Sequence, residues 1–522
     1  MKPGENLAVI DLGSNSFRLV VFLAGEGWWK RTDEIYEPVR IGEGLARSGK
    51  LGREPMARAM ATLDVFAQFS RASGLQGEAI DAVATSAIRD AENAEGFLRR
   101  ARERSGLPIR VLSREEEAHY GYLAAVNSTT LADGYVLDLG GGSMQLVRVA
   151  ARRAVESGSW RVGTVRMSER FLPANGPAKR RQIEALGDHV AAELARDGWP
   201  SAGQRPKGGG PVAGGRLVGI GGTVRNLAAA AQRAAGLPSN GVQGMVLERE
   251  ALDELVQRLA ALPAAERASV PGIKPARADL ILAGAVVVQG VLRAGGFDGL
   301  EATEAGLREG VFLERLLKDR RTTSDRSPLF EDVRRASVLN LAGQYQFDVA
   351  HTRHVAALAL GMFDELARLG LHDGDPRERE LLWAASMLHD IGMSVDYDDH
   401  HKHSRYLILN AGLPGFSPVE VAIIAQAAHY HRKGMPDPGP LRALFADGDA
   451  ERLDRCAVLL RLAEDLERSR DQLVRGTRIA LHDQEVELRL IADGESVVPR
   501  WAANRERELF ARAFHRELAV AA

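Results

Sequence analysis

Two segments of the chain place a carboxylate directly before a glycine turn that is rich in small hydroxyl side chains. In one, an apolar run ends at Asp11 and passes through residues 13–16 into a second apolar run. In the other, the same pattern surrounds Asp138 and residues 140–143. Glycines let backbone N–H groups close on an anion, and a carboxylate beside them suits a cation that touches the anion. We therefore predict a metal-assisted phosphate site with Asp11 and Asp138 as metal ligands.

The two segments lie about 130 residues apart and indicate an internal duplication. Each is predicted to be strand, tight turn and strand. A third glycine turn, followed by a predicted helix, lies at residues 219–223. The residues expected to contact phosphoryl oxygens are Gly13, Ser14, Asn15, Ser16, Arg89, Gly140, Gly141, Gly142, Ser143, Gly221, Gly222 and Thr223.

Two further positions stand where a strand gives way to a helix. Arg89 follows Thr85-Ser86, a place suited to a phosphate contact, although a solvated helix arginine is about equally compatible. Glu116 follows Ser113 at capping-box spacing, which predicts helix-start electrostatics for at least two of the three glutamates at 115–117. The third could project into a cleft as a base.

Composition limits the remaining possibilities. The chain has 522 residues, 45% hydrophobic and 26% charged, with a net charge of −2. These values predict a soluble, multidomain globular protein, with no overall basic field for nucleic acid. One cysteine rules out a disulfide framework, and we expect a cytoplasmic protein without membrane spans.

The pattern along the chain predicts four parts. These are an α/β lobe at 1–128, a second at 129–312, a histidine-rich all-α domain at 325–475 and a small strand–helix domain at 476–522. A glycine-rich surface loop at 198–215 and a charged linker at 318–326 interrupt them.

At these motifs the sequence resembles the Ppx/GppA family of exopolyphosphatases and guanosine pentaphosphate phosphatases. The matching stretches run from the Asp11 turn through residues 84–91, 116–118, the Asp138 turn and 221–223 to Gly306-Leu-Arg-Glu-Gly310. The resemblance implies two actin- and Hsp70-like (ASKHA, ribonuclease H-like) lobes, Mg²⁺-assisted hydrolysis of terminal phosphoanhydrides, with Mn²⁺ as a substitute, and a homodimer.

The resemblance also implies individual roles. The family's catalytic glutamate maps to Glu116, with Glu117 beside it. Gln145 stands where the family usually has a metal-binding glutamate; glutamine keeps an oxygen ligand and removes a charge. Mg²⁺ would thus be held by Asp138, with Gln145 and Asp11.

The histidine-rich part resembles the HD phosphohydrolase superfamily. His351, His389 and Asp390 match its first metal ligands, and the expected final aspartate is Glu464 here. This departure favours a helical module with less than one tightly bound transition metal per chain. We also consider 400–403 and 431–433 as cationic contacts for a polyanion, although a solvated surface is the simpler interpretation.

The function predicted from the sequence is an exopolyphosphatase that uses a glutamate base. Guanosine pentaphosphate 5′-phosphatase is the alternative in the same reaction class, with guanosine tetraphosphate as a further ligand. An HD-type metallophosphohydrolase and a non-enzymatic sensor of polyphosphate or alarmone remain as competing hypotheses.

Overall fold

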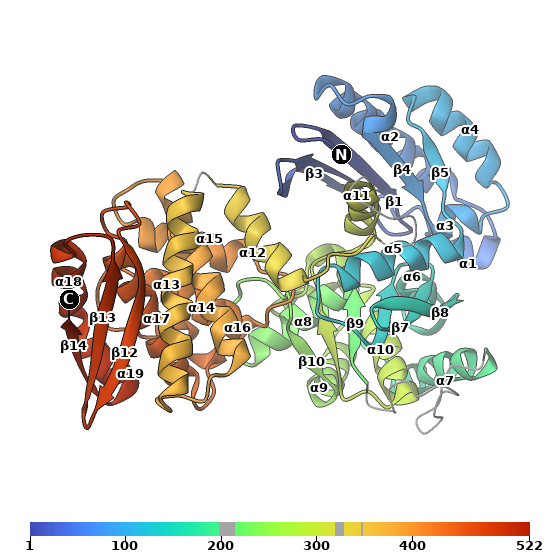
Figure 1. Cartoon of the computed structure of the whole chain (residues 1–522). Helices are drawn as coiled ribbons and strands as arrows, with labels where there is room; N and C mark the ends of the chain where they lie inside the picture. Colours follow the sequence, from blue (N-terminus) through green and yellow to red (C-terminus); the bar gives the residue numbers. More distant parts are fainter. Residues whose placement is uncertain (198–214, 319–327, 346–347, 522) are drawn as a thin grey trace. The chain divides into compact units, whose positions relative to one another are not determined.

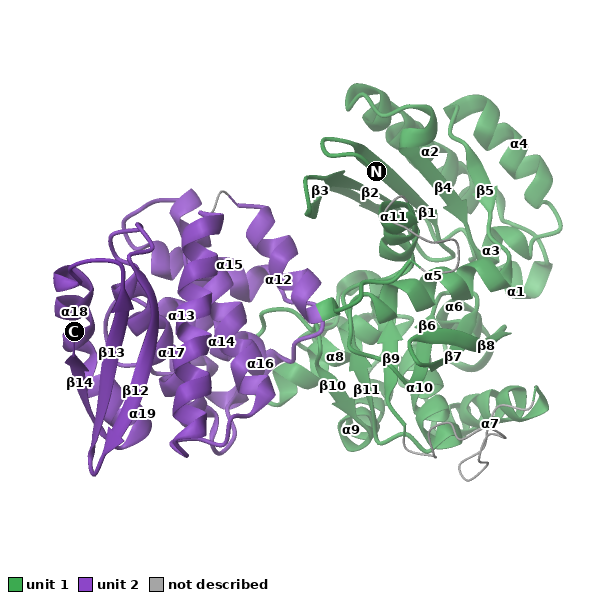
Figure 2. Cartoon of the chain, in the orientation of Figure 1, with its two compact units in different colours: residues 1–333 green, residues 334–522 purple. Residues whose placement is uncertain are grey.

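The computed structural model describes residues 1–197, 215–318, 328–345 and 348–521. The chain forms two compact units, Met1–Val333 and Arg334–Ala522 (Figure 2). The predicted loop at 198–215 and linker at 318–326 lie almost wholly outside the described residues. The predicted four-part division stays a prediction.

The first unit begins with a five-stranded sheet in the order β3-β2-β1-β4-β5, in which β1 pairs antiparallel with β2 and parallel with β4. Its strands are β1 (Asn6–Leu12), β2 (Phe17–Ala24), β3 (Trp29–Glu37), β4 (Ile80–Ala84) and β5 (Ile109–Val111). The helices of this part are α1 (Leu45–Ser48), α2 (Arg53–Ala72), η1 (Gly77–Ala79), α3 (Ser86–Arg89), α4 (Ala94–Ser105) and α5 (Arg114–Val126).

A six-stranded sheet in the order β10-β11-β9-β6-β7-β8 follows. Its strands are β6 (Gly134–Leu139), β7 (Met144–Ala150), β8 (Arg153–Trp160), β9 (Leu217–Ile220), β10 (Val246–Glu248) and β11 (Gly299–Ala302). The accompanying helices are α6 (Thr164–Phe171), α7 (Arg180–Arg196), α8 (Gly222–Ala234), α9 (Arg249–Ala260), η2 (Ala264–Ser269), η3 (Pro275–Arg277), α10 (Ile281–Gly295) and α11 (Leu307–Lys318).

Successive residues of a strand point to opposite faces of its sheet, so each sheet contributes side chains to two cores. In β1, Ala8 and Ile10 pack with α2 and α4, whereas Leu7 and Val9 belong to a core that also holds α5, α11 and the inner face of the second sheet. Helix α5 packs on β6–β9, and α11 packs on α5 and on β1 (Figure 1). Within the first unit, α5 thus packs on the sheet that follows it and α11 packs on the sheet that precedes it, so the two sheets share one core.

The second unit is a helical assembly with a small three-stranded sheet in the order β12-β13-β14. Its helices are α12 (Val333–Gly343), α13 (Val349–Arg368), α14 (Pro376–Leu388), η4 (Ile391–Ser394), α15 (His400–Ala411), α16 (Pro418–His429), η5 (Gly439–Leu444), α17 (Asp449–Leu466), α18 (Val497–Ala503), η6 (Asn504–Glu506) and α19 (Arg507–Phe514). The strands are β12 (Val474–His482), β13 (Glu485–Ala492) and β14 (Glu517–Ala521).

The predicted fold class is confirmed: two α/β sheets precede a helical region and a small sheet. Strands β12 and β13 form an antiparallel hairpin in this small sheet. Within the described ranges, no helix combines the length and apolar character needed to cross a membrane.

Candidate active site

The two predicted glycine turns close hairpins of the same construction. In β1–β2 the Gly13 N–H donates to the Ser16 carbonyl at 3.2 Å, and in β6–β7 the Gly140 N–H donates to the Ser143 carbonyl at 3.0 Å. Asp11 lies opposite Arg18 in the first ladder and Asp138 lies opposite Gln145 in the second. The duplication read from the sequence is therefore repeated in the backbone.

The tips of the two hairpins meet. A Cβ on Gly142 would lie 2.7 Å from the Ser86 Oγ and 2.9 Å from the Ser14 Oγ. These two hydroxyls are hydrogen-bonded to each other at 3.1 Å. Glycine is required at 142 because any side chain would separate the tips.

The third turn begins a helix beside Asp138. Gly221 has a φ of +95° at the N-cap of α8, and its Cβ would lie 3.4 Å from Asp138 Oδ1. Glycine adopts this φ without strain. The unpaired N–H groups at the start of α8 add a further site for an anion.

A cavity of about 110 Å³ opens between these turns. It is lined by Asp11, Gly13, Ser14, Asn15, Ser16, Arg18, Thr85, Ser86, Glu117, Asp138, Leu139, Gly140, Gly141, Gly221, Gly222, Arg225, Arg277, Gly306, Leu307 and Arg308. Most of the predicted phosphate-binding and metal-binding residues are therefore brought together. The predicted residues that do not line it are Arg89, Glu116, Gly142, Ser143, Gln145 and Thr223.

Four arginines around the cavity, Arg18, Arg225, Arg277 and Arg308, were missed as site residues by the sequence analysis. Arg308 lies in the 306–310 motif, and Arg18 stands opposite Asp11, so pattern could have indicated these two. Arg277 ends η3 and has no motif around it. The cavity is bordered by four guanidinium groups and three carboxylates. This excess of positive charge suits a multiply charged anion.

The arginines are held differently. Arg308 donates to Asp11 at 3.1 Å, and Arg225 donates to the Glu304 carbonyl at 2.7 Å. The Arg277 guanidinium lies over Gly222 and makes no hydrogen bond or ion pair with any described residue. Burial, with the positive charge of Arg308, lowers the pKa of Arg225 to about 10, so it stays charged at neutral pH.

The three carboxylates repel one another. Burial, together with the charges of Glu117 and Asp11, raises the pKa of Asp138 to about 7. Burial also raises the pKa of Asp11, against the opposing effect of Arg308, and the pKa of Glu117, against that of Arg89. A divalent cation would relieve this repulsion, and carboxylate oxygens are suitable ligands for Mg²⁺.

The structure separates the two neighbouring glutamates. Glu116 accepts from the Ser113 N–H at 2.8 Å and completes the predicted capping box of α5. Its side chain is 48% exposed and lies beside Arg110, outside the cavity. Glu117 is buried and lines the cavity instead. This geometry disagrees with the prediction that Glu116 is the base. Consecutive side chains of a helix point about 100° apart, so only Glu117 of the two borders the cavity.

Arg89 contacts protein rather than the cavity. It donates to Glu117 Oε2 at 2.8 Å and to the Leu112 carbonyl at 3.0 Å. The predicted phosphate contact is replaced by a bond that positions the Glu117 carboxylate.

Two amide side chains have unsatisfied atoms at the site. Asn15 lines the cavity, and both its Oδ1 and Nδ2 are buried without a hydrogen-bond partner. Gln145 donates to the Ser143 Oγ at 2.9 Å, and its Oε1 has no partner. Buried amide groups normally find partners, so Asn15 in particular indicates a polar ligand.

Two models of one protein family match the chain. The model of the Ppx/GppA phosphatase family matches residues 29–319, and that of Ppx/GppA phosphatase domain III matches residues 333–508. The chain belongs to the Ppx/GppA phosphatase family. This membership confirms the resemblance drawn from the glycine turns and identifies the protein as a phosphatase.

Solved structures are similar to about three fifths of the chain. A Ppx/GppA family member from Aquifex aeolicus has a TM-score of 0.51 and 28% identity, covering 61% of this chain and 99% of its own. An exopolyphosphatase from Cytophaga hutchinsonii has a TM-score of 0.53 and 21% identity, covering 60% of this chain and 98% of its own. The second likeness concerns the fold alone.

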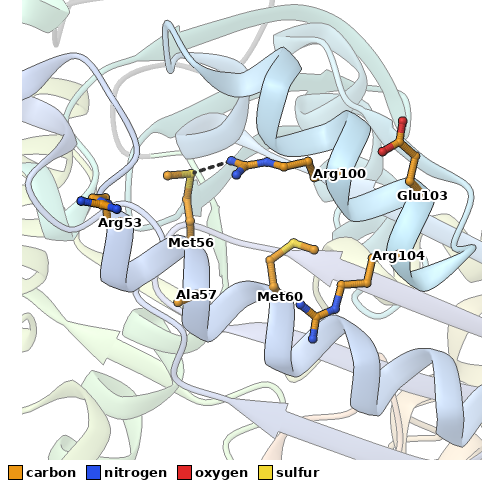
Figure 3. A pocket seen from close by; sticks show the side chains of 7 residues that line it. All are labelled: Arg53, Met56, Ala57, Met60, Arg100, Glu103 and Arg104. Atoms are coloured by element: carbon orange, nitrogen blue, oxygen red, sulfur yellow. Dashed lines mark hydrogen bonds between the residues drawn. The ribbon is translucent and has the colours of Figure 1, made fainter.

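A second hollow, of about 570 Å³, lies between α2 and α4 of the phosphatase (Figure 3). Its walls are Arg53, Met56, Ala57, Met60, Arg100, Glu103 and Arg104. Figure 3 shows Arg100 directed at the Met56 sulfur and Arg104 beside Met60. No group of carboxylates converges there, so the larger hollow lacks the chemistry of the smaller one.

The residues matched to HD metal ligands also come together, in the second unit. His351 Nε2 lies 3.0 Å from Glu464 Oε2, and His389 Nε2 lies 3.5 Å from Asp390 Oδ1. By contrast, His400, His401 and His431 are buried, so the predicted polyanion contacts from these histidines are wrong. Lys402, Arg432 and Lys433 remain exposed.

Proposed function

We propose that the phosphatase releases terminal orthophosphate from inorganic polyphosphate in the cavity between the two glycine hairpins. The observation that carries this proposal is the set of four arginines around three glycine turns and three carboxylates. A terminal phosphoryl group would accept hydrogen bonds from backbone N–H groups of the turns and from the unsatisfied Nδ2 of Asn15.

Glu117 is the proposed base in place of Glu116. Its carboxylate borders the cavity, and Arg89 fixes its orientation. Burial raises the pKa of Glu117, which makes it a better proton acceptor than an exposed glutamate, and the bond to Arg89 opposes this rise. Glu117 would orient a water molecule toward the terminal phosphorus and take its proton.

Phosphoryl transfer depends mainly on positioning and on neutralising charge. Arg277 and Arg225 would bind the equatorial and bridging oxygens, and Arg308 would hold Asp11 ionised through their ion pair. Asp138 and Asp11 would hold a divalent cation, Mg²⁺ or Mn²⁺, with Gln145 near them; when bound, the ion supplies charge neutralisation at the phosphate oxygens.

Polyphosphate is favoured over guanosine pentaphosphate by the cavity walls. No aromatic side chain is among the described residues that line the cavity. Recognition of a nucleotide would need a surface on which the base can stack. A chain of phosphates needs cationic contacts alone, and the arginines supply them.

The test is phosphate release from long polyphosphate and from guanosine pentaphosphate at matched concentrations of terminal phosphate, with and without Mg²⁺. We expect a higher kcat/KM for polyphosphate and no release without a divalent ion. A higher kcat/KM for guanosine pentaphosphate would reverse the substrate assignment, and release of neither phosphate would contradict the proposed function.

A further inference from the structure

Helix α6 braces the second glycine turn, residues 140–143, on the side away from the cavity. The Thr164 N–H donates to the Gly140 carbonyl at 3.0 Å. The Val165 N–H donates to the Gly141 carbonyl at 2.8 Å. Both glycines line the cavity, whereas no residue of α6 is among the described residues that do so. Because the C=O and N–H of a trans peptide point in opposite directions, these bonds turn the N–H groups of the two peptides toward the side that faces the cavity.

Arg166, on the same helix, contacts both halves of the first unit. Its Nε donates to the Gly142 carbonyl at 3.3 Å, in the turn between β6 and β7. Its Nη2 donates to Asp90 Oδ2 at 3.5 Å. Asp90 is the C-cap of α3, which follows strand β4 of the first sheet. The side chains of Arg166 and Asp90 are 19% and 10% exposed, so water screens this pair less than it screens a surface ion pair.

Helix α3 is therefore held against the second glycine turn at both of its ends. It is a single turn, Ser86–Arg89. At its start, the Ser86 Oγ lies so close to Gly142 that a Cβ there would be 2.7 Å away. At its end, Asp90 is bonded to Arg166, which also holds the Gly142 carbonyl. A one-turn helix that is fixed at two points shifts only together with the turn that holds it.

The same short helix carries the arginine that orients the proposed base. Arg89 donates to Glu117 Oε2 at 2.8 Å, and its Nε lies 3.9 Å from Asp90 Oδ1. Asp90 is neutralised by Arg166 and by Arg161, whose Nε lies 3.2 Å from Asp90 Oδ2. Without Arg166, Asp90 would attract the Arg89 guanidinium more strongly, and the base would lose part of its orientation.

We propose that Arg166 is a positioning residue for the hydrolysis: through Gly142 and Asp90 it holds the second glycine turn in a fixed relation to Arg89 and thereby to the base. This inference rests on the proposed function, in which Glu117 takes the proton of the attacking water. Arg166 does not line the cavity, so it acts through the residues that it holds. In-line attack needs the base and the phosphoryl group at a fixed separation, and a misplacement of about 1 Å can cost about 10²-fold in rate.

The first test separates kcat from KM in steady-state phosphate release, with whichever of polyphosphate and guanosine pentaphosphate is hydrolysed faster. Arg166→Met should lower kcat about 10–100-fold and change KM less than about threefold, because Arg166 lies behind the turn and the cavity arginines remain. Arg170→Met is the matched control, because this exposed arginine of the same helix contacts His189 at 3.2 Å, and it should change neither constant. A wild-type kcat in Arg166→Met, or a raised KM with an unchanged kcat, would overturn the proposal.

The second test is a double-mutant cycle between Arg166 and Asp90. Asp90→Ala removes the same bond from its other end and should lower kcat about tenfold. The double variant of Arg166→Met and Asp90→Ala should be no slower than the slower single variant, because residues that act as one unit are not additive. Arg161→Met removes the more exposed cation beside Asp90, whose side chain is 59% exposed, and should have the smallest effect of the four. Effects of the two single variants that multiply in the double variant would overturn the proposal.

Amide hydrogen exchange without substrate tests the coupling apart from catalysis. In Arg166→Met, exchange should become faster both at residues 139–143 and at residues 86–90, which lie on opposite sides of the lost contacts. Exchange in α2 should stay as in wild type, which shows that the variant is folded. Faster exchange at residues 139–143 alone, or at neither segment, would overturn the proposal.

The Glu117→Gln variant distinguishes this inference from the proposed function. A wild-type rate in Glu117→Gln, beside a low kcat in Arg166→Met, would contradict the proposed base and leave the coupling of the turn to α3 in place. An inactive Glu117→Gln variant, beside a wild-type kcat in Arg166→Met, would contradict the role of Arg166 and leave the base in place. Hydrogen exchange decides the role of Arg166 even where neither substrate is hydrolysed.

Discussion

The phosphate cavity of the first unit differs from the histidine cluster of the second, which consists of His351, His389, Asp390, His400, His431 and Glu464. In the cavity, Arg277 pairs with no described residue, and both side-chain polar atoms of Asn15 lack a hydrogen-bond partner. In the histidine cluster, three imidazoles are held by backbone carbonyls at or near their own helix ends. The cavity therefore leaves polar groups available to a ligand, whereas the groups of the cluster contact one another.

This difference bears on what each site can exchange. Guanidinium groups and glycine turns bind a polyanion through many weak contacts, each of which can be released. Mutations in the cavity should therefore change rate and KM.

The largest effect is expected from the glutamate that borders the cavity. Glu117→Gln should lower kcat by about 10²–10⁴-fold, because loss of a positioned general base typically costs that much. Glu116→Gln is the matched control and should lower kcat less than threefold, with little change in stability, because glutamine at this position can also complete the capping box. Phosphate release and thermal unfolding of both variants decide between them. Inactivation by Glu116→Gln with Glu117→Gln still active would restore the base to Glu116.

A smaller effect is expected from Arg277, the cavity arginine that pairs with no described residue. Arg277→Met should raise the KM for polyphosphate about 10–100-fold, since a hydrogen bond to a charged group contributes about 1.5–3 kcal/mol. The melting temperature should stay unchanged because no ion pair is lost within the protein. Arg104→Met is the control, because Arg104 pairs with Asp64 on the surface of α4 and α2. Equal KM values for the two variants would show that Arg277 does not contact substrate.

Local pattern predicted part of the site. The glycine turns, the capping box at Ser113 and the neighbourhood of Asp138 follow from residues close together in the sequence, where turn and helix-start chemistry is decisive. Arg277 could not be predicted, because its position in the cavity depends on how η3 packs over Gly222. The choice between Glu116 and Glu117 likewise depends on the rotation of α5 in the core.

Local sequence pattern also could not predict that α5 packs on the second sheet and α11 on the first. Both helices are apolar on more than one face, and which sheet each one covers is fixed by long-range contacts. In the histidine cluster, the 400–403 run looked like a polar surface, because helical periodicity did not show that His400 would turn inward.

The pH dependence of stability offers a third test of the cavity. Asp138 has a folded pKa of about 7, above its ordinary value, so between about pH 4 and pH 7 the folded state holds a proton that the unfolded state has lost. Stability in chelator should therefore fall as pH rises through this range. The Asp138→Asn variant should lack this pH-dependent decrease in stability. At pH 8 we expect it to be about 2 kcal/mol more stable than wild type, a figure reduced for partial solvation of the cavity.

The measurement is thermal or denaturant unfolding of both proteins in chelator from pH 5 to pH 8. Excess Mg²⁺ should shrink the difference at pH 8, because the ion compensates the carboxylates of wild type. A difference that does not change with pH would mean that Asp138 is already ionised at pH 5. The histidine cluster should not contribute to the difference, since Asp138 belongs to the other unit.

The smallest effect is expected at Gln145, where a neutral amide stands opposite Asp138 in the β6–β7 ladder. Gln145→Glu adds a fourth carboxylate near the cavity, and its oxygen replaces the amide that now donates to the Ser143 hydroxyl at 2.9 Å. Added negative charge should strengthen binding of a hard divalent ion and increase repulsion when the ion is absent. We expect the Mg²⁺ concentration for half-maximal rate to fall about threefold to tenfold, and stability in chelator to fall by about 1 kcal/mol. Gln145→Met, which offers no oxygen, is the matched control and should require more Mg²⁺ than wild type. Identical Mg²⁺ titrations for the glutamate and methionine variants would show that position 145 lies beyond the influence of the ion and that Asp138 and Asp11 hold it without this side chain.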